Sequence, residues 1–267
     1  MPRLHSKAFA AALLAVLAAG CDRAPAPPAS PALPETSAAP RERLGLMTSL
    51  PLYWPLGAGV EDIASGRAAP PWPRAALEQD FVIEPLDTLS PIPGLTPDAP
   101  ETDPLAGLTR LAVIQPRGLS PADNVALDGW VRGGGRLLLV LDPFLTGDYD
   151  LPLGDPRRPA DTALIPPVVE RWGLTVSYAA AEPAQTDHGT RDLPGGLTLP
   201  FARPGRLAIL PDGAQACALV GGHDIMATCR IGKGTVTLLA DAAIFEHPET
   251  AGEGGAILRQ FMQSVLR

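Results

Sequence analysis

Residues 111–142, LAVIQPRGLSPADNVALDGWVRGGGRLLLVLD, decide the fold. Two continuous apolar runs, 111–115 and 136–142, stand on either side of a segment that has the boundary signals of a helix. Ser120 suits the N-cap, a proline follows it at the first helical position, and three glycines at 133–135 stop the helix. A strand, a helix and a second strand in this order predict a parallel pair whose connecting helix covers the sheet.

Two more apolar runs precede this unit and extend the same pattern. Residues 44–50 and 81–85 are continuous rather than alternating, and a helix-like segment at 74–79 lies between them. Strands of this kind are buried on both faces. We therefore predict an α/β fold, with a mostly parallel sheet sandwiched by helices. The helix that begins after Ser120 should turn the following side chains toward the sheet: Val125, Leu127, Trp130 and Val131.

The C-terminal part of the chain is richer in short strands. Helices are expected at 164–172, despite its two prolines, and at 255–266. Between them, tight turns separate short apolar segments at 174–177, 197–201, 206–210, 216–220, 225–231 and 235–240. We expect a C-terminal β-rich extension, with hairpins at about 195–235, on a single α/β domain that spans 44–267.

The N-terminus has the pattern of an export signal. Arg3 and Lys7 precede an apolar stretch at 8–19, which is shorter than the roughly 20 residues of a membrane-spanning helix. Small residues then lead to Cys21. We interpret 1–20 as a lipoprotein signal peptide and Cys21 as the lipidation site, which would hold the protein on a lipid bilayer through its acyl chains.

Two neighbouring residues bear on this interpretation. Leu17 stands four residues before the cysteine, whereas bacterial lipoproteins usually have leucine three before it, so an ordinary secretory signal with an incidental cysteine is the alternative. Asp22 resembles the signal that retains lipoproteins in the inner membrane.

Residues 21–43 are rich in Pro and Ala, which predicts a disordered linker. We expect a bacterial cell-envelope lipoprotein that faces the periplasm.

The charge of the chain excludes one class of function. The formal net charge is −8, and removal of Arg3 and Lys7 with the signal would take it to −10. Non-specific nucleic-acid binding depends on clustered Lys and Arg that release counterions. Nucleic acid is therefore not an expected partner.

Two cysteines flank a predicted turn. Glycines at 221 and 222 separate two short strands, which places Cys217 opposite Cys229. Outside the cytoplasm such a pair can oxidise to a disulfide that contributes about 2 to 4 kcal/mol of stability. Two buried free thiols are the alternative. Neither interpretation requires catalysis.

The usual catalytic motifs fail on physical grounds. Residues 118–122 resemble a nucleophile elbow, but Pro121 lacks the N–H that the oxyanion hole needs, and helix capping explains Ser120. No helix N-terminus follows either strand cysteine to lower the pKa of its thiol. The histidines beyond the leader are scattered and lack metal-ligand spacing. We therefore expect no catalytic residue, no metal and no cofactor.

Open α/β sheets bind ligands in the crevice at the carboxyl ends of their parallel strands. The sequence puts a set of candidate residues at or near this edge: Ser49, Tyr53, Trp54, Gln115, Asp142 and Asp241. Structural roles stay open for them. The two aspartates resemble loop-initiating or helix-capping residues, and the aromatic pair could cover the core.

Three segments carry a resemblance to a known family: 48–54 (TSLPLYW), 129–138 (GWVRGGGRLL) and 232–236 (GKGTV) with the strand that runs on to Asp241. They resemble extracytoplasmic auxiliary proteins of gliding-motility-type ABC transport systems and overlapping families of unknown function. The resemblance implies a fold like class I glutamine amidotransferases, of flavodoxin-like topology but without a catalytic triad. It also implies an ABC permease and ATPase as partners.

The function expected from these observations is that of a non-enzymatic, membrane-tethered periplasmic binding or scaffold lipoprotein, accessory to an ABC-type transport or envelope system. One alternative is a hydrolase of envelope glycan or peptide that uses Asp142 and Asp241 as a carboxylate pair. Another alternative is a purely structural lipoprotein.

Overall fold

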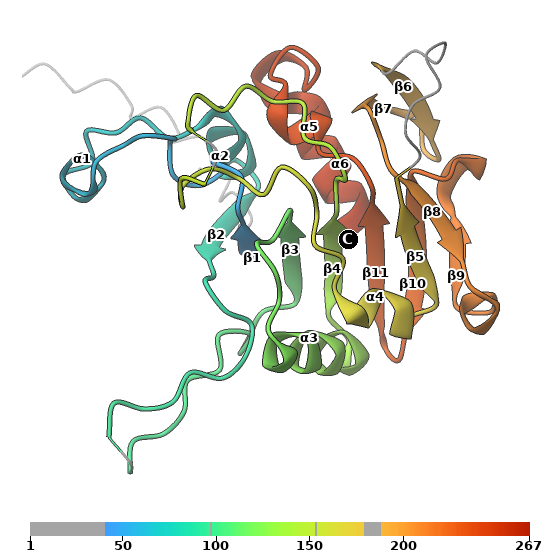
Figure 1. Cartoon of the computed structure of the whole chain (residues 1–267), viewed down its shortest axis with the longest axis horizontal. Coiled ribbons are helices and arrows are strands. Elements are labelled where there is room, and N and C mark those ends of the chain that lie inside the picture. The colour runs from blue at the N-terminus through green and yellow to red at the C-terminus, as the bar shows by residue number, and fades with distance from the viewer. Residues whose placement is uncertain (1–40, 97, 153, 179–187) are drawn as a thin grey trace, which may run out of the picture. The chain divides into compact units, whose positions relative to one another are not determined.

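The computed structural model describes residues 41–96, 98–152, 154–178 and 188–267 (Figure 1). The predicted signal peptide at 1–20, Cys21, Asp22 and nearly all of the predicted linker at 21–43 lie outside the described residues. Pro40–Arg267 form one compact unit. Within the described residues, every helix is too short or too polar to cross a membrane.

A seven-stranded sheet forms the centre of this unit, with the strand order β2-β1-β3-β4-β11-β10-β9. Neighbouring strands are parallel from β2 to β11, whereas β10 is antiparallel to both of its neighbours. The strands are β1 (Glu42–Thr48), β2 (Phe81–Pro85), β3 (Arg110–Ile114), β4 (Arg136–Val140), β9 (Cys217–Leu219), β10 (Met226–Ile231) and β11 (Gly234–Leu239). The predicted α/β fold with a mostly parallel sheet is confirmed.

The helices are mostly short. They are α1 (Val60–Ala64), α2 (Trp72–Leu77), α3 (Pro121–Gly133), α4 (Pro167–Arg171), α5 (Ala243–Glu246) and α6 (Ala256–Leu266). Three 3₁₀ turns lie at Pro211–Gly213, Val220–Gly222 and Glu253–Gly255.

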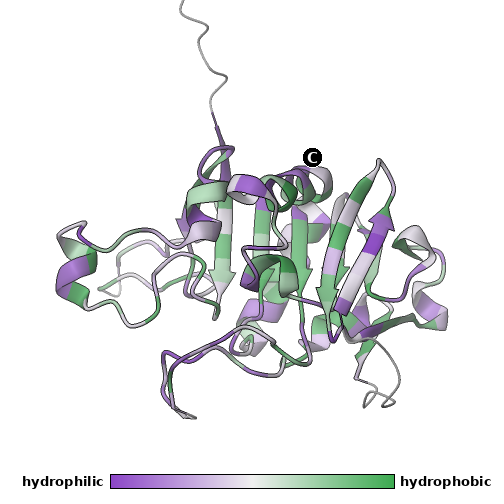
Figure 2. Cartoon of the chain, turned by 90° about the horizontal axis from the view of Figure 1, so that it is seen from above, coloured by the Kyte–Doolittle hydropathy of each residue, from purple (hydrophilic) through white to green (hydrophobic). Residues whose placement is uncertain are grey.

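The alternation of side chains along the strands divides the apolar residues between two hydrophobic cores. In β4, Leu138 and Val140 belong to one core, while Leu137 and Leu139 belong to the other. Residues of α2 and α6 complete the first core, and residues of α3 and α4 complete the second. Figure 2 shows the strands as largely hydrophobic. Helices on both faces therefore explain why these strands are continuous apolar runs.

The N-terminus of α3 has the predicted cap. Ser120 Oγ accepts the N–H of Asp123 at 3.1 Å, and the Asp123 carboxylate accepts the N–H of Ser120 at 3.1 Å. The same carboxylate also accepts the N–H groups of Leu89 and Ser90, at 2.8 and 2.9 Å. Burial acts to raise the pKa of Asp123, but hydrogen bonds from Ser120, Thr88 and these backbone groups hold it well below its ordinary value. Asp123 thus joins α3 to the segment that follows β2.

Two predictions about helices are wrong in detail. Val125 does not face the sheet and is 74% exposed, because it lies about 200° around the helix from the buried Leu127. The helix predicted at 164–172 begins only at Pro167, and Leu164 is exposed. Proline lacks the N–H that a helix interior requires, so the consecutive prolines mark the start of α4.

The β-rich part is not one extension. β9 and β10 continue the central sheet, whereas β5 (Leu174–Ser177) pairs with β8 (Arg206–Ile209), and β6 (His188–Leu193) pairs with β7 (Leu197–Ala202), as two separate two-stranded sheets. β6 was not predicted, because its sequence HGTRDL contains one large apolar residue, and its partner β7 supplies the buried side chains.

β11 departs from the prediction that placed 235–240 with the antiparallel extension. It pairs antiparallel with β10, as the tight turn between them suggests, but it is also parallel to β4 over five residues. A hairpin is visible in local sequence, whereas the second neighbour of a strand comes from a distant segment. β11 is consequently the fifth strand of the parallel set.

Two glycine-rich turns pack against each other at the amino ends of β4 and β11. The backbone N–H of Thr235 donates to the carbonyl of Gly135 at 3.1 Å. A Cβ atom at Gly234 would overlap the carbonyl oxygens of Val131 and Gly135. The glycines in two of the segments that carry the family resemblance therefore have a packing role at this end of the sheet.

A disulfide joins β9 to β10. Cys217 and Cys229 lie opposite each other in the antiparallel ladder, form the bond and are both buried. Neither sulfur is available as a thiolate nucleophile in this state.

Replacing both cysteines, Cys217→Ala together with Cys229→Ala, should lower the free energy of unfolding by about 2 to 4 kcal/mol, because the bond closes a short loop in the unfolded chain. Urea unfolding monitored by circular dichroism measures the change. The reduced wild-type protein should show a comparable loss. Unchanged stability in both samples would rule out a stabilising disulfide.

Candidate functional site

The four polar candidates follow the ends of four adjacent parallel strands. Ser49 follows β1, Gln115 follows β3, Asp142 follows β4 and Asp241 follows β11. Ser49 is 8% exposed, Asp241 is 1% exposed, and the other two are fully buried. The structure thus brings these predicted residues to the same edge of the sheet, but it places them beneath other parts of the chain.

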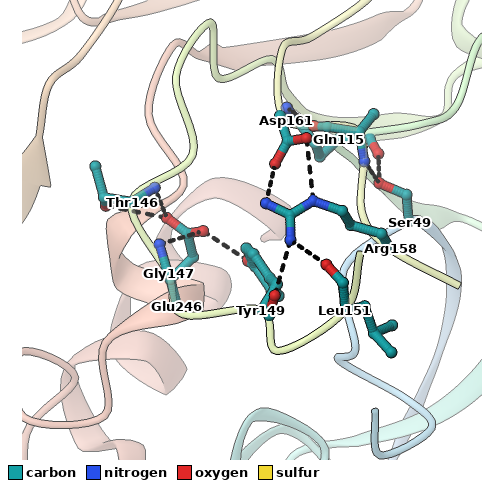
Figure 3. A network of polar contacts seen from close by, with 10 residues as sticks. Ser49, Gln115, Thr146, Gly147, Tyr149, Leu151, Arg158, Asp161 and Glu246 are labelled. Carbon is teal, nitrogen blue, oxygen red and sulfur yellow. Dashed lines mark hydrogen bonds and ion pairs between the residues drawn. The ribbon is translucent and has the colours of Figure 1, made fainter. Parts of the chain in front are cut away.

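Ser49 and Gln115 belong to one hydrogen-bonded network (Figure 3). The Nε2 of Gln115 donates to the carbonyl oxygens of Asp142 and Ala160, at 2.9 and 2.8 Å, and its Oε1 accepts the N–H of Asp142 at 2.8 Å. Ser49 Oγ donates to the Gln115 carbonyl at 2.5 Å and accepts the N–H of Ala160 at 3.2 Å. Gln115 has a φ of 46°, a conformation that favours glycine, and the network holds it there. These hydrogen bonds connect the loop after β4 to the carboxyl ends of β1 and β3.

The two aspartate carboxylates are also engaged by backbone groups. Asp142 accepts N–H groups from its own loop and from the residue after Asp241, both at 2.7 Å. Asp241 accepts the N–H of Ala202, at the end of β7, and of Ala243, at the start of α5, at 2.8 and 2.9 Å. Each carboxylate therefore connects segments that are far apart in the sequence.

Burial shifts the ionisation of both groups. It raises the pKa of Asp142 to about 7, with a further contribution from the charge of Glu246. It also raises the pKa of Asp241 well above its ordinary value, with a contribution from Asp142. A raised pKa suits a general acid, but a glycoside hydrolase needs its carboxyl groups beside the scissile bond. Both oxygens of each group already accept backbone N–H groups, which favours a structural role over the hydrolase alternative.

A second polar cluster, which no sequence motif marks, ties the same loop to α5 (Figure 3). Glu246 accepts the N–H groups of Thr146 and Gly147 at 3.2 and 2.9 Å and the hydroxyl of Tyr149 at 2.6 Å. Burial, together with Glu246, raises the pKa of Tyr149. Arg158 donates to two loop carbonyl groups at 2.8 Å each. About a hundred residues separate Glu246 from its partners, so local sequence gave no signal for this contact.

Tyr53 and Trp54 lie on the loop after β1, where the sequence placed them. Arg74 of α2 packs on both rings, with its Cζ 4.0 Å from the Tyr53 centroid and 5.4 Å from that of Trp54. The two rings meet edge to face, with centroids 4.7 Å apart. Arg74 thus fixes an aromatic pair of which Trp54 remains 47% exposed.

This aromatic pair lines an open pocket of about 310 Å³ at the carboxyl ends of β1 and β2, which we name the carboxyl-edge pocket. Its wall is mainly apolar, and Asp87 and Arg157 are its charged residues. Ser49 also lines it, whereas Gln115, Asp142 and Asp241 do not. The volume is at the lower end of the range for small-ligand sites.

Comparison with known proteins gives likenesses to solved structures alone. No protein-family model and no curated protein matches the chain. The exo-beta-1,4-mannosidase Op5Man5 from Opitutaceae bacterium strain TAV5 is 15% identical, with a TM-score of 0.48 over 85% of this chain and 36% of the mannosidase. The cold-adapted beta-galactosidase from Rahnella sp. R3 is 10% identical, with a TM-score of 0.46 over 85% of this chain and 32% of that enzyme.

A protein described as ThuA-like, from Bacteroides uniformis, is 10% identical, with a TM-score of 0.42 over 86% of this chain and 93% of its own length. The chain spans about a third of the length of the two glycosidases. Likenesses of this degree do not assign the chain to a family or to an activity.

The serine and cysteine residues that could act as nucleophiles by sequence motif have structural roles. Ser120 serves as a helix cap, and the strand cysteines are bonded to each other. Within the described part of the chain, no group of three or more His, Cys, Asp or Glu residues could hold a metal ion. The carboxyl-edge pocket offers instead an exposed aromatic ring and two charged side chains, which suit recognition of a ligand or partner.

Proposed function

We propose that this protein is a non-enzymatic, membrane-tethered periplasmic lipoprotein that binds a partner protein or an envelope ligand through the carboxyl-edge pocket. The observation that carries the proposal is a contrast between the residues at this edge of the sheet. The buried side chains of Gln115, Asp142 and Asp241 form hydrogen bonds within the protein, whereas Trp54 is exposed on the pocket wall. Such a site binds without supplying a reacting group.

The tether and the biological setting come from the sequence. The apolar leader and Cys21 support a lipid anchor, and Asp22 supports retention in the inner membrane. The resemblance of segments 48–54, 129–138 and 232–236 supports a role beside an ABC permease and ATPase. We therefore propose that the protein is accessory to an ABC-type transport or envelope system.

The finer fold assignment belongs to the same proposal. The parallel strands β2-β1-β3-β4-β11, numbered by their order in the parallel set, follow the order 2-1-3-4-5, which is that of flavodoxin-like folds. This order supports a domain with the topology that the resemblance to class I glutamine amidotransferases implies.

We expect the full-length protein, purified in mild detergent from its native membrane, to bring an ABC permease and ATPase with it in near-stoichiometric amounts. Trp54→Ala should lower this recovery about tenfold, because it removes the exposed aromatic side chain of the pocket. Quantitative mass spectrometry of the purified fractions measures both results.

Tyr178→Ala is the matched control, because Tyr178 is a similarly exposed aromatic residue, at 43%, that does not line the pocket. It should leave recovery unchanged. Recovery of the protein alone would contradict the transport proposal. Equal recovery with the Trp54 variant would remove the pocket from the interface, as a purely structural lipoprotein predicts.

A further inference from the structure

A second and larger concavity lies on the outer side of α3, between this helix and residues 86–109, which connect β2 to β3 and which we name the arm. It has a volume of about 700 Å³ and is lined by Val125, Ala126 and Trp130 of α3 and by Pro91 and Leu105 of the arm, among others. We name it the α3 groove. It shares no lining residue with the carboxyl-edge pocket, so it is a separate surface.

Val125, on the wall of the α3 groove, is exposed without a structural reason within the described chain. Val125 is 74% exposed in the middle of a helix whose opposite side is buried in the core. Ile92, which follows the lining residue Pro91 in the sequence, is 46% exposed. Figure 1 shows the arm reaching away from the sheet on the side of α3. An exposed apolar side chain on the wall of an apolar groove is a feature of interaction sites.

Both walls of the groove are held in place. Asp123, on the first turn of α3, accepts the N–H groups of Leu89 and Ser90 at the base of the arm. Farther out, Ile92 and Thr102 exchange backbone hydrogen bonds at 2.8 and 2.9 Å. A groove with fixed walls binds a partner without the cost of ordering its own surface.

The charge around the groove favours a basic occupant. Residues 84–109 contain no Lys, Arg or His, and their acidic residues include Asp98, Glu101 and Asp103, all exposed. Asp103 also lines the groove, whose lining contains no basic residue. A ligand that places cations beside these carboxylates would be attracted and oriented.

The dimensions of the groove fit a helix. Its lining on α3 runs from Pro121 to Trp130, which corresponds to about 14 Å along the helix axis, or about three turns of a second helix packed beside it. Small residues on this face, Ala122, Ala126 and Gly129, allow close approach of the occupant. Docking of an amphipathic helix into an apolar groove is a recurrent mode of recognition.

We propose that the α3 groove binds an amphipathic helix of a partner protein, with apolar side chains packed beside Val125 and Trp130 and with a Lys or Arg side chain facing Asp103. The proposal goes beyond the function assigned to the carboxyl-edge pocket. It names a second surface and the chemistry of the segment that occupies it.

The test uses two synthetic, fluorescein-labelled peptides of about four helical turns with the same Leu and Ala face. One carries Lys on its flanks and the other carries Glu. Fluorescence anisotropy measures their binding to the full-length protein in an uncharged detergent. We expect saturable binding of the Lys peptide at one site and at least tenfold weaker binding of the Glu peptide.

Val125→Asp should weaken binding of the Lys peptide at least tenfold, because it places a charge inside the apolar contact. Val60→Asp is the matched control, because Val60 is an exposed valine on α1, at 84%, that does not line the groove. Both variants add one negative charge, so non-specific attraction of a basic peptide would strengthen equally in both. Asp103→Lys should reduce the preference for the Lys peptide over the Glu peptide, because Asp103 is the charged residue of the groove lining.

Three results would overturn the proposal. These are the absence of saturable Lys-peptide binding, an equal affinity of the Val125 and Val60 variants, and a self-association in sedimentation velocity that Val125→Asp abolishes. The last result would make a second copy of this chain the occupant. Failure of the peptide tests would leave recovery of the ABC components and its dependence on Trp54 unaffected, so the two proposals fail separately.

Discussion

The Gly234→Ala variant is expected to lose about 3 kcal/mol of unfolding free energy. A Cβ atom at this position would overlap the carbonyl oxygens of Val131 and Gly135, and both belong to the backbone. Neither oxygen can move without displacing the end of α3 or the start of β4, so the strain is not relieved by a change of rotamer. Urea unfolding monitored by circular dichroism gives the difference.

Gly129→Ala is the matched control in the same region. Gly129 lies inside α3, and nothing is within 4 Å of a Cβ atom built there. Alanine restricts the unfolded chain more than glycine does, so this variant should gain about 0.5 to 1 kcal/mol. Equal effects of the two substitutions would show that the packing of the glycine-rich turns does not constrain the fold.

Stability is expected to fall as the pH rises from about 5 to 8. The folded-state pKa of Asp142 is raised to about 7, and that of Asp241 is raised as well, so their contribution to stability is complete below the ordinary carboxyl pKa. It is lost as the pH rises from the ordinary carboxyl pKa to the folded-state pKa, at about 1.4 kcal/mol per pH unit for each carboxyl. Thermal unfolding between pH 4 and 8 measures the slope.

The loss of stability at low pH has a different origin. The pKa of Asp123 is held low in the folded protein, so its contribution is present above the ordinary pKa and is lost as the pH falls below it. Stability should therefore be greatest near pH 4, with a fall on either side. Asp142→Asn should be less stable than the wild type at pH 5, because the amide NH₂ group takes the place of an oxygen that accepts a backbone N–H. The variant should lose less unfolding free energy than the wild type between pH 5 and 8, because its side chain does not titrate. A wild-type stability that rises toward pH 8 would contradict this assignment.

Local sequence rules predicted the strands and caps that depend on nearby residues. The strand at 81–85 and the cap at Ser120 follow from apolar runs and capping chemistry, and both are present. The placement of Gln115 and Asp142 at one edge follows from the topology of parallel strands. These are properties that short segments encode by themselves.

The roles of the same residues depend on contacts that short segments do not encode. Asp241 accepts a backbone N–H from Ala202, and Gln115 donates to the carbonyl of Ala160. These hydrogen bonds depend on how distant loops fold over the sheet. The exposure of Val125 has a different cause. Val125 lies about 200° around the helix from the buried Leu127, so helical periodicity alone places it on the side away from the core, and the prediction did not follow that periodicity.

The division of the apolar residues between two cores has a consequence for how this chain tolerates change. Leu138 and Leu139 are adjacent in the sequence, yet they project into different cores on opposite faces of the sheet. Leu138 shares its core with Phe261 of α6, more than a hundred positions away. Side chains that share partners are energetically coupled, whereas those without shared partners contribute additively. Substitutions on one face of the sheet can therefore accumulate with little regard to those on the other, so the two halves of the fold are free to diverge at different rates.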